Sequence, residues 1–138
     1  SSYRINGTID RLDYLPGSAT IRILDYKTGR VTLNKTSPVE ACFEDVKNKE
    51  AFQGYLYAWL YDKKHPDKRI QVGYYTARHL NEGIQYLNGG TPVAVEALQE
   101  FEIHMKALIG KVLSSGFEQT TDEQKCRICP YKGICNRG

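Results

Sequence analysis

The chain has 138 residues, of which 19 are basic and 16 acidic, so its formal net charge is +3. This length allows a single domain with a modest core, and 41% hydrophobic with 25% charged residues is an ordinary globular composition. The charge is too small to argue for nucleic-acid binding by itself, and no apolar run approaches the roughly 20 residues that span a bilayer. No signal peptide is visible at the start, so we expect a soluble, cytoplasmic protein with no membrane partner.

The first two apolar segments predict a β-hairpin over residues 3–14 and 20–27. Between them lie Pro16 and Gly17, which favour a turn because Pro fixes φ and Gly tolerates positive φ. A symmetric turn centred after Gly17 sets the pairing of the two strands, whereas a bulge would shift that pairing by one residue.

The symmetric register places Asp10 directly opposite Asp25, with Lys27 next along on the same face. Two facing carboxylates repel each other, and a hard divalent cation such as Mg²⁺ or Mn²⁺ removes that penalty. A metal together with a positioned ammonium supplies what phosphodiester hydrolysis requires, namely an activated water and charge neutralisation on the phosphate.

Gly7-x-x-Asp10 followed by Asp25-Tyr26-Lys27 resembles the active-site hairpin of the PD-(D/E)XK nuclease superfamily, in its RecB-like branch. The resemblance implies a restriction-endonuclease-like α/β core, with a central mixed β-sheet flanked by helices. It also implies that Asp10, Asp25 and the carbonyl of Tyr26 hold the metal, and that Lys27 orients or activates the attacking water. An Asp-x-Lys on an exposed strand is commonplace, so the pairing with Gly-x-x-Asp carries the resemblance.

The family usually places a helix ahead of the Gly-x-x-Asp strand, and that helix contributes a further acid or a histidine to the metal site. This sequence passes from Ser1-Ser2 directly into the predicted strand. We therefore expect a fragment of a longer protein, weakly active or inactive by itself.

The apolar pattern turns helical from about residue 45 to 64 and ends at His65-Pro66, with Phe52, Leu56, Trp59 and Leu60 at three- and four-residue intervals. Gln53 and Tyr57 share one face of this helix. Gln53-x-x-x-Tyr57 resembles the motif that follows the lysine strand in RecB-like nucleases, where these side chains face the active site and the DNA. The alternative is an aromatic-rich core helix, which we favour for Tyr55 and Trp59.

The remaining core elements are two strands and a long helix. Residues 70–78 and 84–87 predict strands joined by a turn at Asn81-Glu82-Gly83. Thr91 as N-cap and Pro92 as first residue predict a helix over 92–115, closed by Gly116. Its apolar stripe is expected to pack on the sheet and comprises Val95, Leu98, Phe101, Met105, Leu108, Ile109 and Val112.

Other polar residues are weaker candidates. Residues 30–38 predict a loop whose basic Arg30 and Lys35 either contact a phosphate backbone or are simply solvated. Arg78 and His79 end a strand without a positional argument for a role, and His104 is expected to be a surface or core-edge residue.

The tail contains Cys126, Cys129 and Cys135 with the spacing Cys-x2-Cys-x5-Cys, and in a cytosolic protein this clustering favours a metal over disulfides. Zinc and iron–sulfur clusters both require four ligands, so one is missing. Cys42 is the remaining thiol, either a fourth ligand or, more simply, a small half-buried residue.

The tail is similar to that of iron–sulfur nucleases of the AddB type and of the related CRISPR-associated exonucleases, including the Pro130-Tyr131 pair after the second Cys. This resemblance implies that the three tail cysteines bind a [4Fe–4S] cluster with a fourth Cys far upstream. We therefore expect no intact cluster in this fragment.

Together these patterns predict a nuclease core over residues 1–116 and a Cys-rich tail over 117–138. The predicted function is Mg²⁺-dependent DNA hydrolysis by a RecB-like exonuclease module of a helicase–nuclease in DNA repair, with DNA and a helicase region as partners. The alternative is a non-catalytic nucleic-acid-binding module with a Cys-ligated metal.

Overall fold

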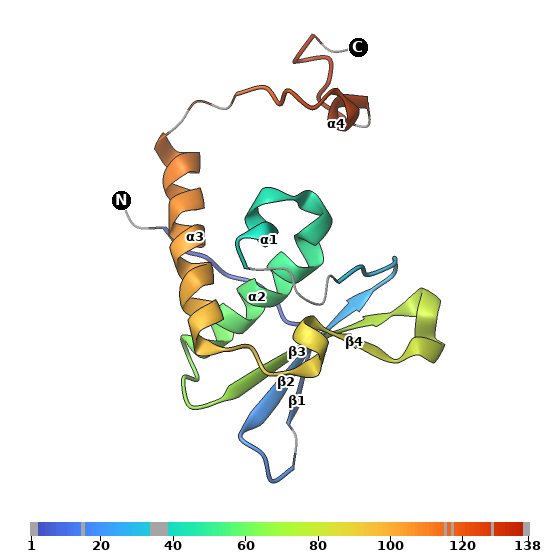
Figure 1. Cartoon of the computed structure of the whole chain (residues 1–138), viewed down its shortest axis with the longest axis vertical. Coiled ribbons are helices and arrows are strands. Elements are labelled where there is room, and N and C mark those ends of the chain that lie inside the picture. Colours follow the sequence, from blue (N-terminus) through green and yellow to red (C-terminus); the bar gives the residue numbers. More distant parts are fainter. Residues whose placement is uncertain are drawn as a thin grey trace. The chain divides into compact units, whose positions relative to one another are not determined.

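A computed structural model describes residues 3–14, 16–33, 39–114, 116, 118–127 and 129–136, with the side chain of His79 left out. The chain forms two compact units, residues 1–106 and 107–138, and the division falls inside the long helix α3 (Val95–Ser114). The first unit contains the sheet, and the second contains the end of α3 and the short helix α4 (Glu123–Arg127) (Figure 1). None of the described helices is long and apolar enough to cross a membrane.

The described part of the first unit contains one sheet of four strands, in the order β1-β2-β3-β4. The strands are β1 (Arg11–Tyr14), β2 (Thr20–Lys27), β3 (Arg69–Thr76) and β4 (Ile84–Tyr86). The β2/β3 pair is parallel and the two outer pairs are antiparallel, so the sheet is mixed. The predicted fold class, an α/β fold with a central mixed sheet flanked by helices, is confirmed.

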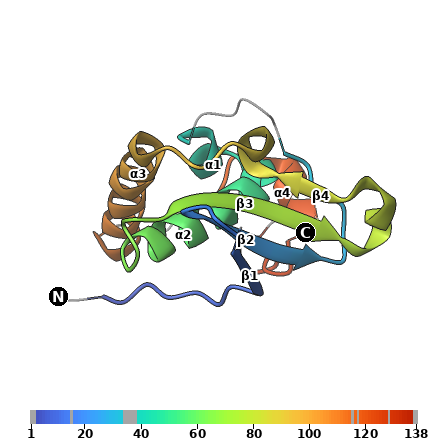
Figure 2. The ribbon, with the colours of Figure 1, turned by 90° about the horizontal axis from the view of Figure 1, so that it is seen from below.

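The hairpin has the predicted register, since Arg11 lies opposite Leu24 and Leu12 opposite Ile23. Gly17 adopts φ 71°, the left-handed conformation that the turn requires. The predicted first strand is nevertheless too long, because residues 3–10 form no strand. This extended segment runs past α2 (Lys49–Asp62), where a Cβ on Gly7 would lie 3.0 Å from the ring of Tyr57 (Figure 2).

The helix predicted over 45–64 is present as α2, but it begins at Lys49 instead of residue 45. A short helix, α1 (Ala41–Glu44), and a 3-10 turn (Val46–Asn48) precede it. Asp45 ends α1 in an extended conformation, and its carboxylate accepts a hydrogen bond from the Lys47 N–H at 2.9 Å. This local cap competes with a continuous helix, so the prediction was wrong about where the helix begins.

Helix α2 packs on the sheet through small residues, including Ala51, Gly54 and Ala58, which are all buried. A Cβ on Gly54 would lie 2.2 Å from the hydroxyl oxygen of Tyr74 on β3, so only glycine permits this approach. Tyr55 is 3% exposed, which confirms the prediction that it is a core residue.

Helix α3 begins at Val95 rather than at residue 92, and Thr91 is not its N-cap. The Val93 N–H donates to the carbonyl of Ile70 at 2.7 Å, so the preceding residues follow β3 as extended chain. Fully buried Phe101 packs against the rings of Phe43, Phe52, Tyr55 and Trp59, which belong to α1 and α2. The predicted stripe therefore packs on helices instead of the sheet, and three of its members, Val95, Leu108 and Val112, are exposed.

The two strands predicted near residues 70–78 and 84–87 are present as β3 and β4, with slightly shorter bounds. Their connection is a 3-10 helix over Ala77–Glu82 followed by Gly83 at φ 70°, and not the short turn that was predicted. Arg78 is exposed on this connection. Part of the predicted 30–38 loop, including Lys35, lies outside the described residues.

Candidate active site

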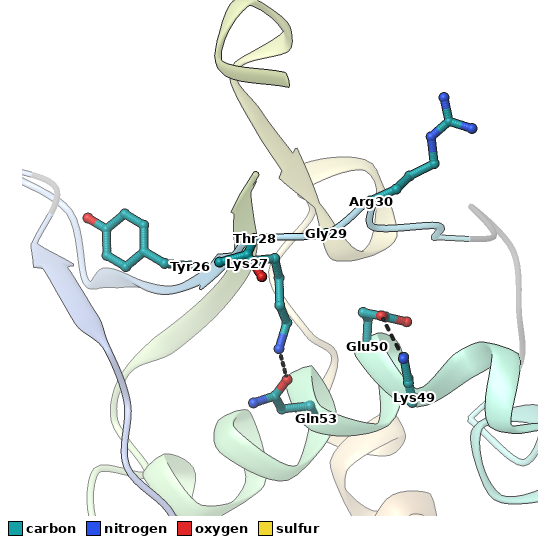
Figure 3. A pocket seen from close by; sticks show the side chains of 8 residues that line it. All are labelled: Tyr26, Lys27, Thr28, Gly29, Arg30, Lys49, Glu50 and Gln53. Atoms are coloured by element: carbon teal, nitrogen blue, oxygen red, sulfur yellow. Dashed lines mark hydrogen bonds and ion pairs between the residues drawn. The ribbon is translucent and has the colours of Figure 1, made fainter. Parts of the chain in front are cut away.

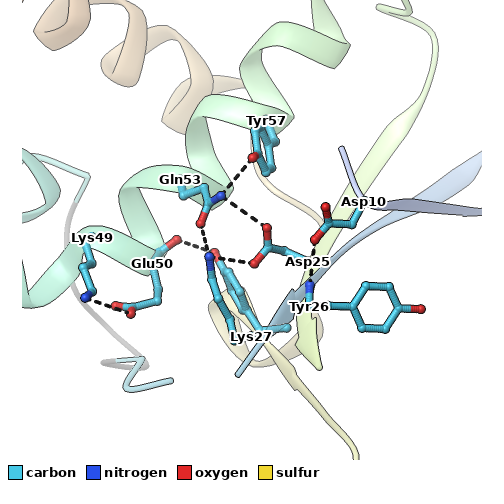
Figure 4. Close-up of polar contacts among 9 residues, drawn as sticks. Asp10, Asp25, Tyr26, Lys27, Lys49, Glu50, Gln53 and Tyr57 are labelled. Carbon is cyan, nitrogen blue, oxygen red and sulfur yellow. Dashed lines mark hydrogen bonds and ion pairs between the residues drawn. The ribbon is translucent and has the colours of Figure 1, made fainter. Parts of the chain in front are cut away.

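Strand β2 presents Asp25 and Lys27 to the face of the sheet that α2 covers, because alternate residues of a strand share a face. Asp25 is 4% exposed, and its Oδ2 lies 2.8 Å from Nζ of Lys27 (Figure 4). A carboxylate this buried is stable only when it is paired, and the ammonium supplies the pair.

Gln53 on α2 connects these two charges. Its Oε1 accepts a hydrogen bond from Lys27, and its Nε2 donates to Oδ1 of Asp25 at 3.2 Å and to the hydroxyl of Tyr57 at 2.8 Å (Figure 4). The structure thus brings together Asp25, Lys27, Gln53 and Tyr57, four of the five residues predicted as catalytic.

Asp10, the fifth, lies immediately before β1 and is exposed. Its Oδ2 accepts a hydrogen bond from the backbone N–H of Tyr26 at 2.9 Å. The N–H and C=O of one strand residue point to the same side, so the Tyr26 carbonyl also points to the side where Asp10 lies. Because β1 pairs with β2 only as far as Leu24, none of the described strands covers this side at Tyr26.

The oxygen atoms of Asp10, Asp25 and the Tyr26 carbonyl are ligands of the kind that a divalent cation prefers. Oδ2 of Asp25 is buried and accepts no hydrogen bond in the described part of the chain, although Lys27 pairs with it. No group of three or more His, Cys, Asp or Glu side chains that could hold a metal occurs among the described residues. Two carboxylates and one carbonyl are still enough for Mg²⁺, which usually binds one or two carboxylates and keeps several waters.

A cavity of about 580 Å³ opens beside this network. Its lining includes Lys27 and Gln53 together with Arg30, Lys49 and Glu50 (Figure 3). Sequence reasoning missed Lys49 and Glu50 as lining residues. Glu50 precedes Gln53 by three residues and so shares its helix face, which is the signal that could have identified it.

Compared with known protein families, residues 1–136 match the PD-(D/E)XK nuclease superfamily. The chain belongs to this superfamily. No curated protein and no solved structure matches the chain. The mixed sheet with its flanking helices is consistent with the restriction-endonuclease-like core of a PD-(D/E)XK nuclease.

Asp13, a further acidic residue of this PD-(D/E)XK chain, forms ion pairs away from Asp25 and Lys27. Its carboxylate pairs with Arg11 and Arg22, each at 2.7 Å, on the face of the sheet opposite to Asp25. The hydrogen bonds from Arg22 and Arg11 hold the pKa of Asp13 below its usual value. The hydroxyl of Tyr26 and the carboxylate of Asp13 in turn raise the pKa of Arg11. Asp13 is therefore neutralised by arginines, and Asp10 is the acid of the hairpin that lies beside Asp25.

The cysteines of the PD-(D/E)XK chain fall into two kinds. Cys42 is buried, and burial raises the pKa of its thiol to about 11, so it stays protonated at neutral pH as a core residue. Cys126, Cys129 and Cys135 lie in the second unit and are partly exposed. Three thiols are one short of the four ligands that zinc or an iron–sulfur cluster requires, so the described residues do not complete such a site.

His104 lies on α3 beside the ring of Phe43, with ring centroids 5.3 Å apart, and its Nε2 is 3.9 Å from Glu100. It is a core-edge residue, as predicted.

Proposed function

We propose that this chain is a metal-dependent deoxyribonuclease that hydrolyses phosphodiester bonds with Mg²⁺ or Mn²⁺. The observation that carries the proposal is that Asp25, Lys27 and Gln53 each contact the other two through an ion pair or hydrogen bonds. In addition, the carboxylate of Asp10 accepts a hydrogen bond from the backbone N–H of Tyr26. Membership of a superfamily of nucleases supports the reaction class.

Asp10, Asp25 and the Tyr26 carbonyl would hold the ion. When bound, such an ion neutralises charge on the scissile phosphate and lowers the pKa of a coordinated water. Asp25 and Gln53 hold the Lys27 ammonium from two sides, so it is fixed where it can orient the attacking water and stabilise developing negative charge. Tyr57 fixes the Gln53 amide through its hydroxyl and thereby acts on Lys27 indirectly.

We further propose that the chain is the RecB-like exonuclease module of a helicase–nuclease in DNA repair. The placement of Gln53 and Tyr57 beside Asp25 and Lys27 supports this assignment, because it is the arrangement that the Gln53-x-x-x-Tyr57 resemblance implies. DNA would be the substrate and a helicase region the partner.

The Cys-x2-Cys-x5-Cys tail extends this proposal. Cys126, Cys129 and Cys135 would supply three ligands of a [4Fe–4S] cluster, with a fourth ligand from outside the described residues. The cluster would act as a structural staple, and the hydrolytic chemistry would remain at Asp25 and Lys27.

Cleavage of DNA by purified protein, in the longest form that contains this sequence, tests the proposed reaction. We expect cleavage that requires Mg²⁺ or Mn²⁺ and stops on chelation, and we expect Lys27→Ala to lower kcat/KM by about 100-fold or more, since the charge it supplies acts in the transition state. Initial rates on labelled single-stranded and duplex DNA provide the measurement. Lys68→Ala is the matched control, because among the described residues Lys68 pairs with its neighbour Asp67 at 3.2 Å and does not line the cavity beside Lys27.

Two outcomes would contradict the proposal. Cleavage that persists in Lys27→Ala would assign the activity to other residues. DNA binding without cleavage under all divalent metals would favour the alternative, a non-catalytic nucleic-acid-binding module.

A further inference from the structure

The stretch Tyr26–Thr28 separates two cavities. One is the cavity of about 580 Å³ lined by the charged residues Lys27, Arg30, Lys49 and Glu50, and the other has a volume of about 320 Å³. Tyr26, Lys27 and Thr28 line both of them. A DNA strand that places a phosphate at Lys27 in the first cavity therefore has the second cavity next to it, across the stretch Tyr26–Thr28.

The second cavity is apolar and aromatic. Besides the shared stretch, it is lined by Tyr75 and Ala77 together with Leu80, which is 58% exposed. The rings of Tyr26 and Tyr75 meet edge to face, with centroids 6.1 Å apart and planes inclined by 68°. This geometry follows from the parallel register, which pairs these two residues and puts both rings on the same face of the sheet.

The Tyr26 ring is accessible to solvent. It is 51% exposed and points away from Asp25 and Lys27 (Figure 4). The hydroxyl of Tyr26 accepts a hydrogen bond from the Arg11 guanidinium at 3.2 Å, so the ring is held in place while its surface stays open. A ring fixed before binding loses less entropy when a partner stacks on it.

Charge also favours a nucleic-acid strand at this place. Arg11 stands beside the ring, and Lys27 and Arg30 line the neighbouring cavity. A cationic rim around exposed aromatic side chains is the combination that single-stranded nucleic acids bind, with the phosphates on the charges and the bases on the rings.

We propose that Tyr26 and Tyr75, on the face of the sheet opposite to Asp25 and Lys27, form with Leu80 a platform for one unpaired base of the DNA strand whose phosphate is held at Asp25 and Lys27. This proposal rests on the proposed nuclease function and adds a substrate preference to it. A base inside a duplex is stacked and paired, so it reaches the platform only by leaving the helix. The platform therefore makes single-stranded DNA the preferred substrate.

Binding in the absence of divalent metal tests the platform without requiring cleavage. Fluorescence anisotropy compares a labelled oligothymidine strand with an abasic strand of the same length, so the phosphates are matched and only the bases differ. Wild-type protein should bind oligothymidine more tightly. Tyr26→Ala should weaken oligothymidine binding about tenfold and remove the difference between the two strands.

Two further variants separate the loss of the Tyr26 ring from a failure to fold. Tyr26→Phe retains the ring and should retain the preference for bases. Leu80→Ser changes an exposed side chain and should lower the preference even if Tyr26→Ala fails to fold. Tyr14→Ala is the matched control, since Tyr14 is 68% exposed on β1 and lines neither cavity.

Cleavage provides the second readout. The ratio of kcat/KM on single-stranded DNA to that on duplex DNA should fall about tenfold in Tyr26→Ala, mainly through a higher KM for the single strand. Equal wild-type binding to oligothymidine and abasic strands, or a base preference that survives in Tyr26→Ala, would overturn the platform. A base preference without any metal-dependent cleavage would instead overturn the proposed nuclease function and leave the platform standing.

Discussion

At the scale of single residues, the site depends on how charges are shared among Asp25, Lys27 and Gln53. The buried carboxylate of Asp25 has the Lys27 ammonium at one oxygen and the Gln53 amide N–H at the other, and the Gln53 carbonyl oxygen accepts a hydrogen bond from the ammonium. Each group thereby fixes the other two, which is the preorganisation that electrostatic catalysis requires. Gln53 has no charge of its own, so we regard it as a positioning residue.

Gln53→Ala tests this role. The substitution leaves the Lys27 ammonium with Asp25 alone, so we expect kcat to fall about 10- to 100-fold while KM changes little, as for other residues that orient catalytic groups. Tyr57→Phe removes only the hydroxyl that holds the Gln53 amide and should have a smaller effect.

A double-mutant cycle separates positioning from independent roles. If Tyr57 acts through Gln53, Tyr57→Phe should have almost no effect in the Gln53→Ala background. If the two losses, expressed as activation free energies, instead add in the double mutant, Tyr57 contacts the substrate independently of Gln53.

At the scale of elements, the site depends on how closely α2 approaches β3. Ala51, Gly54 and Ala58 give the helix a flat, small-residue face, and Tyr74 reaches past Gly54 to donate its hydroxyl to the Glu50 carbonyl. Burial raises the pKa of Tyr74, so the hydroxyl remains a donor. This docking sets the height of Gln53 above Asp25 and Lys27.

Gly54→Ala should disturb that docking. The new Cβ would lie 2.2 Å from the Tyr74 hydroxyl, so the helix must shift, and we expect the free energy of unfolding to fall by about 1–3 kcal/mol. Urea denaturation gives the measurement. Adding Tyr74→Phe removes the clashing oxygen and should recover part of the loss.

Gly110→Ala on α3 is the control for helix propensity. No atom of the described residues outside the helix's own backbone lies within 4 Å of a Cβ at Gly110, so alanine should leave stability equal or raise it by up to about 1 kcal/mol. If Gly54→Ala were as harmless as Gly110→Ala, the close approach of α2 would not limit stability.

At the scale of the whole molecule, the chain consists of two compact units, and we propose a different role for each. The first unit, residues 1–106, contains the sheet and the proposed catalytic residues. The second, residues 107–138, contains the cysteine tail. The superfamily match covers residues 1–136 and so includes both units.

Iron and sulfide analysis tests the proposed role of the tail. In protein purified without oxygen, in the longest form that contains this sequence, we expect iron bound through Cys126, Cys129 and Cys135, because each thiolate is a cluster ligand. Replacing Cys129 by serine should release the iron, whereas Cys42→Ser should not, since Cys42 is buried with a raised pKa. Iron retained after all three tail cysteines are changed to serine would contradict the assignment.

The sequence by itself determined the register of the hairpin, because the turn is local and its symmetry fixes the pairing of Leu12 with Ile23. It also determined that Asp25 shares a face with Lys27, and Gln53 with Tyr57, since strand and helix periodicities alone decide this.

Only the tertiary structure decided which other strands and helices these faces pack against. The parallel pairing of β2 with β3, the small face of α2 on Tyr74 and the packing of Phe101 on helices all join residues far apart in the chain. The fold also separates the roles of Asp10 and Asp13, because it brings the backbone N–H of Tyr26 to Asp10 and the guanidinium of Arg22 to Asp13. Such contacts depend on the shapes and charges of both partners at once, and no periodicity within one segment contains that information.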